Sequence, residues 1–289
     1  MKKIKIIGLL AILLTICFTT TGCTSDNMEN INVLVTNYPN EYIAQKLYGE
    51  HSTITSIYPD GVDINEYKVN SKQKNDFSKY DLFIYNGLIE KERNLAVDLL
   101  DLNPDLKIID TAYVLETDYS PEELWLNPSS LLMMAQNVRL GLEEYISSDI
   151  LKEEIDTSYE ELKVELSELD ATYRIDVENT NTKLIVVANS ALKYLEKFGL
   201  EVYCIDSDAT DKTISDVQNL IDDKTISYIY SFKEEELNDT VKNFIDNNEN
   251  ISLLEMHKLD NITDAERNNK DDYITIMRSN LEIIKKEIY

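Results

Sequence analysis

The chain has 289 residues, with 54 Asp and Glu against 28 Lys and Arg, and a formal net charge of −26 at pH 7. Such a charge argues against nucleic acid or anionic lipid as a partner of the protein surface, since both would repel it. It suits a secreted protein that must stay soluble. A chain of this length is long enough for one large lobe or two medium lobes with their own cores.

The segment 1–22 has the pattern of a secretory signal peptide. Lysines at positions 2, 3 and 5 precede an apolar run over 6–18 that is too short for a stop-transfer helix, and small and polar residues follow. Cys23, directly after Gly22, resembles the acylated cysteine of bacterial lipoproteins, although Thr20 stands where an aliphatic residue is usual. We expect Cys23 to carry lipid and residues 23–30 to tether the protein to the extracellular face of the bacterial cytoplasmic membrane.

Apolar, β-branched runs alternate with helix-compatible stretches along the rest of the chain. The runs lie at 31–35, 52–58, 81–85 and 106–110 in the first half, and at 183–188, 201–205, 226–231 and 251–255 in the second. Strand–helix alternation with short connections predicts an α/β fold with two lobes, each built on a mainly parallel sheet flanked by helices.

A single long helix is predicted between the two halves. Residues 149–178 contain no glycine or proline, and their apolar residues follow spacings of 4, 3, 4, 3 and 4 from Ile155 to Tyr173. The helix would be roughly 40 Å long. A coiled coil is the alternative, but fewer than five heptads favour packing against the protein's own lobes. The expected division is an N-terminal lobe at 31–148, a linking helix at 149–180 and a C-terminal lobe at 181–289.

Enzyme signatures are absent from the sequence. There is no Walker loop, no GxGxxG and no GxSxG, and the two histidines, His51 and His257, lack a second His or Cys at metal-ligand spacing. With Cys17 in the leader and Cys23 lipidated, Cys204 alone remains, so a disulfide framework is excluded. These patterns predict a binding protein, not an enzyme, with its ligand in the cleft between two lobes.

Six stretches, in the same order along the chain, are similar to landmarks of one family. They are VLVTNYPNEYIAQKLYGE (33–50), YPDGVDINEYKV (58–69), DLFIYNGLIEKE (81–92), ELWLNP (123–128), NSALKYLEKFGLEV (189–202), and LDNIT with YITIMRSNLEIIKK (259–286). Together with the order of the elements, they resemble the metal-binding receptors of ABC importers for zinc and manganese. The resemblance implies two α/β lobes joined by a long helix, a divalent metal ion as cargo, delivery to a membrane permease, and a monomer.

The resemblance also implies where the metal ligands lie. Asn65 stands at the family's first-loop histidine, Glu123 at the histidine before the tryptophan, and Asn189 at the histidine or glutamate after the fifth strand. Asp260 stands at the last ligand, a carboxylate. Two carboxylates and two amide carbonyls favour hard ions such as Mn²⁺, Ca²⁺ or Mg²⁺, and the loss of imidazole disfavours tight zinc binding.

Four aromatic residues fall on stretches that resemble the cleft walls: Tyr38, Tyr67, Trp125 and Tyr194. Ordinary packing at half-buried positions is the alternative. The acidic run 233–237 is expected to be the solvated first turn of a helix.

Two alternatives concern the metal itself. His257, three residues before Asp260, could supply an imidazole, although a residue in that place more often faces solvent or a lobe core. The protein could also be a degenerate family member without a metal site, acting as an adhesin-like or interaction lipoprotein. Four oxygens that converge on one point would favour a receptor, and splayed asparagines would favour a scaffold.

Overall fold

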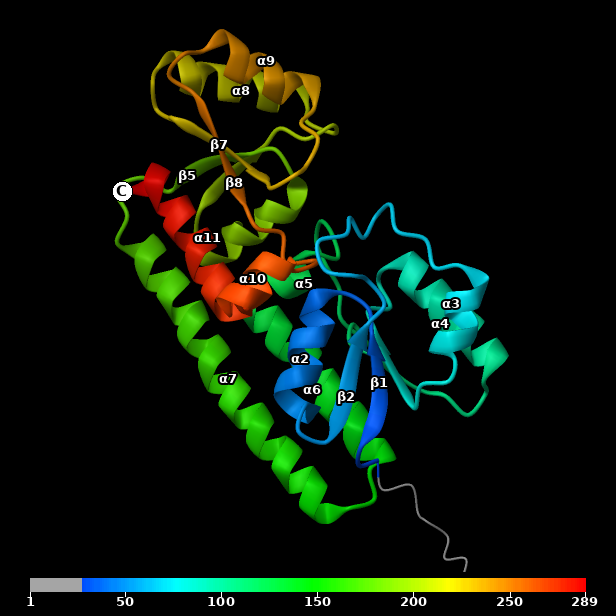
Figure 1. The fold of residues 1–289 in the computed structure, drawn as a ribbon. Coiled ribbons are helices and arrows are strands. Elements are labelled where there is room, and N and C mark those ends of the chain that lie inside the picture. Colours follow the sequence, from blue (N-terminus) through cyan, green and yellow to red (C-terminus); the bar gives the residue numbers. More distant parts are fainter. Residues whose placement is uncertain (1–27) are drawn as a thin grey trace, which may run out of the picture.

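The computed structural model describes residues 28–289 (Figure 1). The predicted signal peptide and Cys23 lie outside these residues. Two separate four-stranded sheets are present, one in each half of the chain, and every strand pair in both is parallel. The predicted α/β fold with two lobes is confirmed.

The N-terminal lobe is built on strands in the order β2-β1-β3-β4. They are β1 (Ile31–Val35), β2 (Ser52–Ser56), β3 (Leu82–Tyr85) and β4 (Lys107–Asp110), with helices α2 (Tyr38–Tyr48), α3 (Ser71–Phe77), α4 (Glu90–Leu102), α5 (Glu123–Leu126) and α6 (Pro128–Tyr145). The strands expected in this half are all found at the predicted runs. The central strand β3 is buried along its whole length, which is typical of a parallel sheet covered on both faces.

The C-terminal lobe repeats the same topology, with strands in the order β6-β5-β7-β8. They are β5 (Leu184–Val187), β6 (Glu201–Cys204), β7 (Tyr228–Phe232) and β8 (Ser252–Met256), with a 3₁₀ helix η1 (Ser190–Phe198) and helices α8 (Asp211–Asp222), α9 (Asp239–Asn247), α10 (Asp264–Asn269) and α11 (Tyr273–Ile288). In each sheet the strand order reverses beside the first strand, between β1 and β3 and between β5 and β7. The carboxyl ends of strands at such reversals are where open α/β sheets bind ligands.

The prediction of a helix turn at 233–237 is wrong. These residues form a turn and an irregular segment, Glu234 has a positive φ of 61°, and α9 begins only at Asp239. Asn238 caps α9, since its side chain accepts a hydrogen bond from the amide of Val241. The acidic side chains of the segment can therefore make tertiary contacts, as described below for Glu235.

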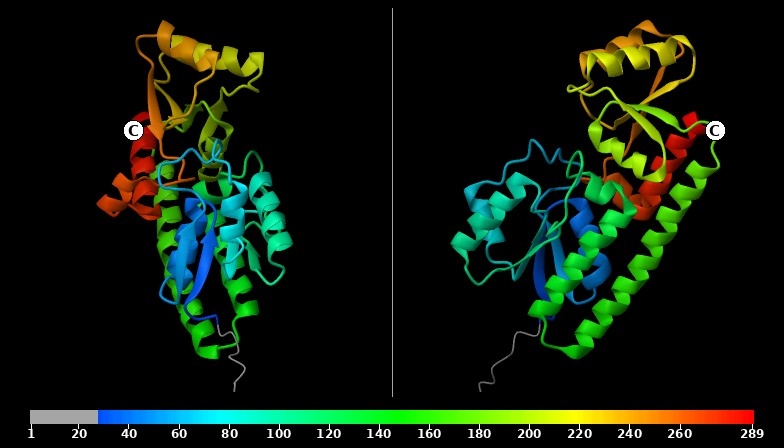
Figure 2. Two further views of the ribbon diagram at one scale, coloured as in Figure 1. Left: turned by 45° about the vertical axis from the view of Figure 1, so that its right-hand side comes forward. Right: turned by 180° about the vertical axis from the view of Figure 1, so that it is seen from behind.

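Helix α7 (Asp149–Glu178) runs beside both lobes (Figures 1 and 2). The predicted apolar stripe is its buried face, from Leu151 through Ile155 and Tyr173 to Val177. It packs against α2 and α6 of the first lobe and against α11 of the second. The stripe therefore covers the protein's own lobes, as the spacing indicated, and the helix forms one hydrophobic core with them.

After β8 the chain leaves the second sheet and crosses to the first lobe before α11 returns. We call residues 257–272 the crossing segment. The amide of Tyr38 donates to the carbonyl of Asp260 at 3.0 Å, and the amide of Gly61 donates to the carbonyl of Ile262 at 2.8 Å. The crossing segment is therefore bound to the N-terminal lobe, although it belongs to 181–289 in the predicted division.

Arg267 binds the second half of the crossing segment to the N-terminal lobe. The Arg267 guanidinium donates to both carboxylate oxygens of Glu41, at 2.6 and 2.8 Å, and to both oxygens of Asp60, at 2.6 and 2.9 Å. Such paired contacts are more specific than a single lysine contact.

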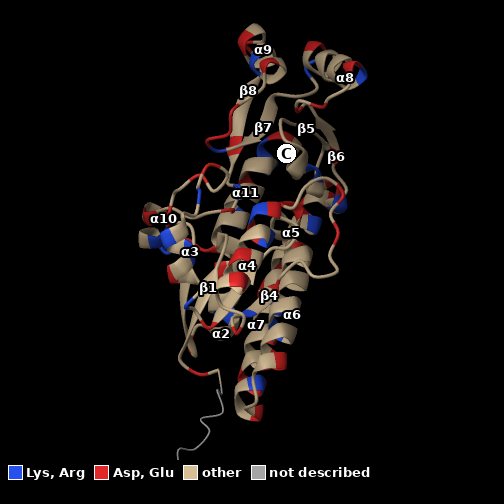
Figure 3. Cartoon of the chain, turned by 90° about the vertical axis from the view of Figure 1, so that its right-hand side faces the viewer, with Lys and Arg blue, Asp and Glu red and all other residues tan. Residues whose placement is uncertain are grey.

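Acidic positions lie on both lobes and along the long helices, with basic positions between them (Figure 3). Within residues 28–289 no helix is both long and apolar enough to cross a membrane.

Candidate functional site

The only tryptophan of the chain joins the two lobes. Trp125 lies on the short helix α5 and is 1% exposed. Its indole Nε1–H donates to the carbonyl of Lys258 in the crossing segment at 2.9 Å, and its own carbonyl accepts from the hydroxyl of Tyr273 at 2.7 Å. Both hydrogen bonds satisfy polar atoms that would otherwise be buried without a partner. Trp125 therefore fixes the backbone of residue 258 against the first lobe.

The two glutamates before this tryptophan have different surroundings. The Glu123 carboxylate, 1% exposed, accepts hydrogen bonds from the amides of Ser120 at 2.8 Å, Tyr119, and Asp118 at 3.4 Å. It holds the loop that enters α5. The Glu122 carboxylate instead contacts the Lys258 ammonium, with 3.2 Å between Oε1 and Nζ. Of the pair, Glu122 faces the crossing segment, whereas Glu123 binds its own loop and also lies 3.7 Å from the Lys197 ammonium of η1.

Glu123→Gln is expected to lower the free energy of unfolding by about 1–3 kcal/mol, because an amide oxygen replaces a charged acceptor and its NH₂ group meets amide donors. Chemical denaturation measures the loss. The matched control is Glu161→Gln on the exposed side of α7, which should stay within about 0.5 kcal/mol of the parent. Equal stability of the two variants would contradict the role of Glu123 in the loop.

Asp260 lies beside the same ammonium as Glu122. The distance from Lys258 Nζ to Asp260 Oδ2 is 3.7 Å, and both side chains are 21% exposed. Burial disfavours the charged form of Lys258, but Glu122, Asp260 and Glu235 outweigh it, so the pKa of the ammonium is raised. Burial raises the pKa of the Asp260 carboxyl, against the opposing effect of Lys258. Asp260 is thus part of an acidic group that already holds one cation.

Asn189 caps a helix of the second lobe. Its Oδ1 accepts from the amide of Ala191 at 2.8 Å, at the start of η1, and its Nδ2 donates to Glu235. Glu235 also accepts from the hydroxyl of Ser231 at 3.3 Å. Asn189 and Glu235 follow β5 and β7, the two strands at the reversal of the second sheet. The amide of Asn189 therefore positions a carboxylate toward the lobe junction, while its own oxygen serves the cap.

Asn65 lies on the exposed surface of the loop after β2. Its amide N–H donates to the Asp63 carboxylate at 2.8 Å. Nearby, the Lys91 ammonium donates to the carbonyl of Ile64. In the described part of the chain no hydrogen bond joins the Asn65 side chain to Glu123, Asn189 or Asp260.

Within the described residues, no hydrogen bond joins any two of the four predicted ligands directly. Asp260 meets Lys258, Asn189 reaches it through Glu235, and Glu123 and Asn65 are engaged elsewhere. Across residues 28–289, no three His, Cys, Asp or Glu side chains lie close enough to hold a metal ion together. The metal roles of Asn65, Glu123, Asn189 and Asp260 stay predictions. Sequence reasoning missed Lys258 and Glu235, whose partners are distant in the chain, whereas Glu122 differs from the predicted residue by one position.

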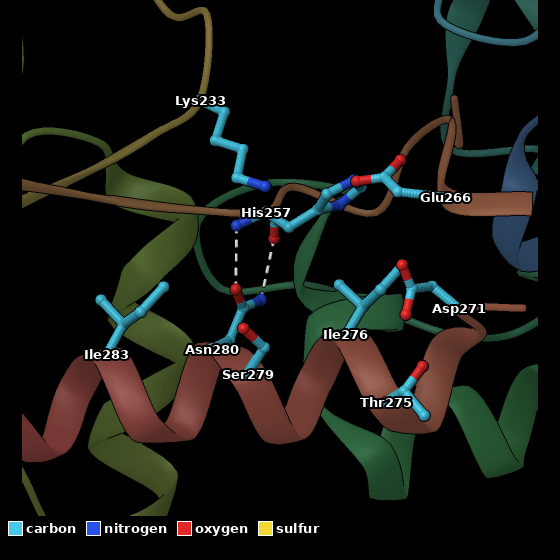
Figure 4. A pocket seen from close by; sticks show the side chains of 9 residues that line it. All are labelled: Lys233, His257, Glu266, Asp271, Thr275, Ile276, Ser279, Asn280 and Ile283. Carbon is cyan, nitrogen blue, oxygen red and sulfur yellow. Dashed lines mark hydrogen bonds and ion pairs between the residues drawn. The ribbon is translucent and has the colours of Figure 1, made fainter. Parts of the chain in front are cut away.

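The two ring nitrogens of His257 are bonded to partners other than Asp260. Its Nδ1 accepts from the amide of Leu259 at 2.8 Å, and its Nε2 is 3.2 Å from the Glu266 carboxylate (Figure 4). Its backbone N–H and carbonyl are both bonded to the side chain of Asn280. Burial lowers the pKa of His257, against the opposing effect of Glu266. With both ring nitrogens engaged at a small pocket beside α11, His257 offers no free imidazole toward Asp260.

The four predicted wall residues are packed rather than open. Tyr38, Trp125 and Tyr194 belong to the core that joins the two lobes to α7. Tyr67 is half-buried and lies edge-on to the ring of Tyr58, with 5.6 Å between ring centroids. Their side chains support the packing around the junction, and their contact with a ligand stays a prediction.

Comparison with known proteins shows which family this chain matches. The model of the family described as zinc-uptake complex component A, periplasmic (ZnuA), matches residues 33–287. The zinc-binding lipoprotein AdcA of Streptococcus pneumoniae (strain ATCC BAA-255 / R6) is 20% identical over 312 aligned residues, covering 99% of this chain and 61% of AdcA. A metal ABC transporter substrate-binding lipoprotein of Lactococcus lactis is 26% identical over 199 residues, covering 61% of this chain and 62% of the relative.

Among solved structures, the Zn(II)-bound ZnuA-like domain of S. pneumoniae AdcA superposes with a TM-score of 0.72 at 20% identity, covering 90% of this chain and 99% of that domain. This likeness confirms the fold. The chain spans 61% of the length of the AdcA relative. The matching proteins are named for metal binding and transport, in agreement with the prediction that the chain is not an enzyme. Because the family model covers residues 33–287, the chain belongs to the family of periplasmic zinc-uptake complex component A proteins.

Proposed function

We propose that this chain is the solute-binding component of an ABC importer of the zinc and manganese type. It would be anchored outside the cell by lipid on Cys23 and would pass a divalent cation to a membrane permease, as a monomer. Support comes from the family and from relatives named as a zinc-binding lipoprotein and as a metal ABC transporter substrate-binding lipoprotein.

One observation carries the proposal to this chain. Acidic groups from separate segments already share one cation where the lobes meet: Glu122 at the start of α5 and Asp260 in the crossing segment both contact Lys258 Nζ. These carboxylates attract the single positive charge of the ammonium. A divalent cation at the same position would be attracted about twice as strongly, because it carries twice the charge. Its oxygen donors favour hard ions such as Mn²⁺ and Ca²⁺ over tight zinc binding.

The present spacing matches an ammonium rather than a metal ion. A hard cation such as Ca²⁺ would require carboxylate oxygens at roughly 2.3–2.6 Å, whereas the two carboxylates lie 3.2 and 3.7 Å from Lys258 Nζ. Cargo binding would therefore draw Glu122 and Asp260 inward. Because these residues come from different segments of the chain, that movement would tighten the lobe junction.

A second function is favoured by the same lysine. If Lys258 permanently neutralises the acidic group, the junction needs no metal, and the family scaffold would serve as an adhesin-like or interaction lipoprotein. The cap role of Asn189 and the loop role of Glu123 fit this alternative, since both would persist without a metal.

Titration with metal ions separates the two functions. The purified protein, freed of metal with a chelator, should melt at a higher temperature when Mn²⁺ or Ca²⁺ is added, with a smaller rise for Zn²⁺ and Mg²⁺. A ligand that binds only the folded state at 100 times its Kd stabilises it by about 2.7 kcal/mol.

The control is the double variant Glu122→Gln and Asp260→Asn, which keeps the side-chain shapes and removes two charges. It should melt at the same temperature with and without the ions. If no ion changes the melting temperature of the parent protein, the importer function is contradicted and the metal-free scaffold is favoured.

A further inference from the structure

Lys258 lies where the crossing segment meets α5 and is positioned by its backbone as well as its charge. Its carbonyl accepts the indole N–H of Trp125 at 2.9 Å, and its ammonium lies 3.2 Å from Glu122 and 3.7 Å from Asp260. The backbone contact holds the residue against α5. The side chain is therefore directed into the acidic group rather than free to move over the surface.

A third acid comes from the second lobe. Glu235 lies in the irregular segment after β7, is held by Asn189 and Ser231, and its charge acts on Lys258. The three acids thus belong to three segments: the start of α5, the crossing segment, and the loop between β7 and α9. The ammonium is in ion-pair contact with Glu122 and Asp260, and the charge of Glu235 helps to raise its pKa.

The neighbouring basic residue does not have this arrangement. The Lys91 ammonium donates to the carbonyl of Ile64 and lies 4.9 Å from the centre of the Tyr58 ring. No ion pair joins it to Glu122, Glu235 or Asp260 within the described residues. Burial lowers the pKa of Lys91 and the charge of Asp260 opposes that shift, but the ammonium in ion-pair contact with Glu122 and Asp260 is that of Lys258.

We propose that the Lys258 ammonium is a built-in cation that fills the inter-lobe site, so that Lys258 determines how strongly the site takes up a divalent cation. An ammonium and a metal ion cannot share the same carboxylates, because the like charges would lie only a few ångströms apart. Lys258 therefore competes with any divalent ion for Glu122 and Asp260, and it keeps the lobes joined without one. The displacement of Lys258 by a cargo ion rests on the proposed function. The masking of the acidic group by Lys258 is independent of that function.

The test is Lys258→Gln, which retains N–H donors for the carboxylates and removes the charge. The metal-free variant should melt at a lower temperature than the parent, because the partly buried carboxylates of Glu122 and Asp260 lose their counter-ion. Calorimetric titration with Mn²⁺ and with Ca²⁺ should show at least tenfold tighter binding than in the parent, and saturation should restore the melting temperature. Lys258→Met, which has no donor, should give the same gain and serves if the Gln variant does not fold.

The matched control is Lys46→Gln. Lys46 pairs with Glu165 at 2.7 Å between α2 and α7, away from the junction, so its loss removes the same charge elsewhere. It should leave the affinity for both ions unchanged.

The outcomes separate this inference from the proposed function. Binding by the Lys258 variants but not by the parent supports the masking role and contradicts metal uptake by the natural protein. Equal binding by parent and variants overturns the masking role and leaves the proposed function standing. Absence of binding in all proteins overturns both.

Discussion

Trp125→Ala is expected to lower the free energy of unfolding by about 3–5 kcal/mol, which would be among the largest effects of any single substitution in this chain. The indole is 1% exposed and lies in the core shared by both lobes and α7. Removing it creates a large cavity and also leaves the carbonyl of Lys258 without its donor. The loss should be measured by urea denaturation followed by circular dichroism, since the variant has no other tryptophan to fluoresce.

Trp125→Phe separates the two causes. Phenylalanine fills most of the volume but has no N–H, so we expect a loss of about 1–3 kcal/mol, smaller than that of the Ala variant. Both variants lose the hydrogen bond that holds the backbone of residue 258. Amide hydrogen exchange in the crossing segment should therefore be faster in each variant than in the parent. A Trp125→Ala variant within about 1 kcal/mol of the parent, the range of ordinary substitutions, would contradict the role of Trp125 as the contact that joins the lobes.

The strands of this fold could be predicted because their signal is local. Each run is short and rich in apolar residues, and all eight runs form strands, with bounds shifted by at most a few residues. The long helix was equally clear, because one apolar stripe without glycine or proline leaves few other structures. Both kinds of pattern depend on neighbours within the same segment.

The acidic run 233–237 shows the limit of predicting structure from neighbouring residues in the sequence. Acids before a helix suit its positive end, which is why the run predicts a first turn. In the structure Asn238 provides the cap and the helix starts after it. Glu235 instead bonds to Asn189 and acts on Lys258, partners that belong to other segments of the chain. A tertiary charge partner cannot be read from spacing.

The site shows the same limit at the scale of one residue. Adjacent side chains on a helix point about 100° apart, so a motif match could not decide between Glu122 and Glu123. The three amides that bind Glu123 lie only three to five residues before it, and a local capping argument could have found them. Lys258 had no such signal, because nothing near it in the sequence identifies Glu122 or Glu235 as its partners.

A second polar group is buried in the first lobe, at the reversal of strand order between β1 and β3. The Glu92 carboxylate accepts from the hydroxyl of Thr36 at 2.6 Å and from the amide of Asn86 at 2.9 Å, both through Oε2. Within residues 28–289 its other oxygen, Oε1, is buried without a protein donor. Burial raises the pKa of Glu92 to about 7, although both hydrogen bonds and Lys91 oppose the shift. Between pH 4.5 and about 7, the folded protein therefore holds a proton on Glu92 that the unfolded chain releases.

This proton makes stability depend on pH in a definite direction. Because the pKa in the folded state exceeds the ordinary value of 4.5, the contribution of Glu92 is fully present below pH 4.5 and is lost as pH rises through about 7. Its full size is on the order of 3 kcal/mol, and about 2 kcal/mol of it is lost between pH 5.5 and 8.5. Glu92→Gln keeps the shape and the acceptor but cannot ionise. Over that interval, the free energy of unfolding of the variant relative to the parent should therefore rise by about 2 kcal/mol, the amount that the parent loses through Glu92.

Urea denaturation of both proteins at several pH values between 5.5 and 8.5 measures the effect as a difference, so that other titrating groups cancel. Glu287→Gln is the control: this carboxylate is half-buried, binds the amides of Ser227 and Tyr228, and also has a pKa raised by burial. Greater contact with solvent should make its pH-dependent change much smaller. Parallel pH profiles for the parent and Glu92→Gln would mean that Glu92 is ionised in the folded protein, and that water or an ion at Oε1 compensates its charge.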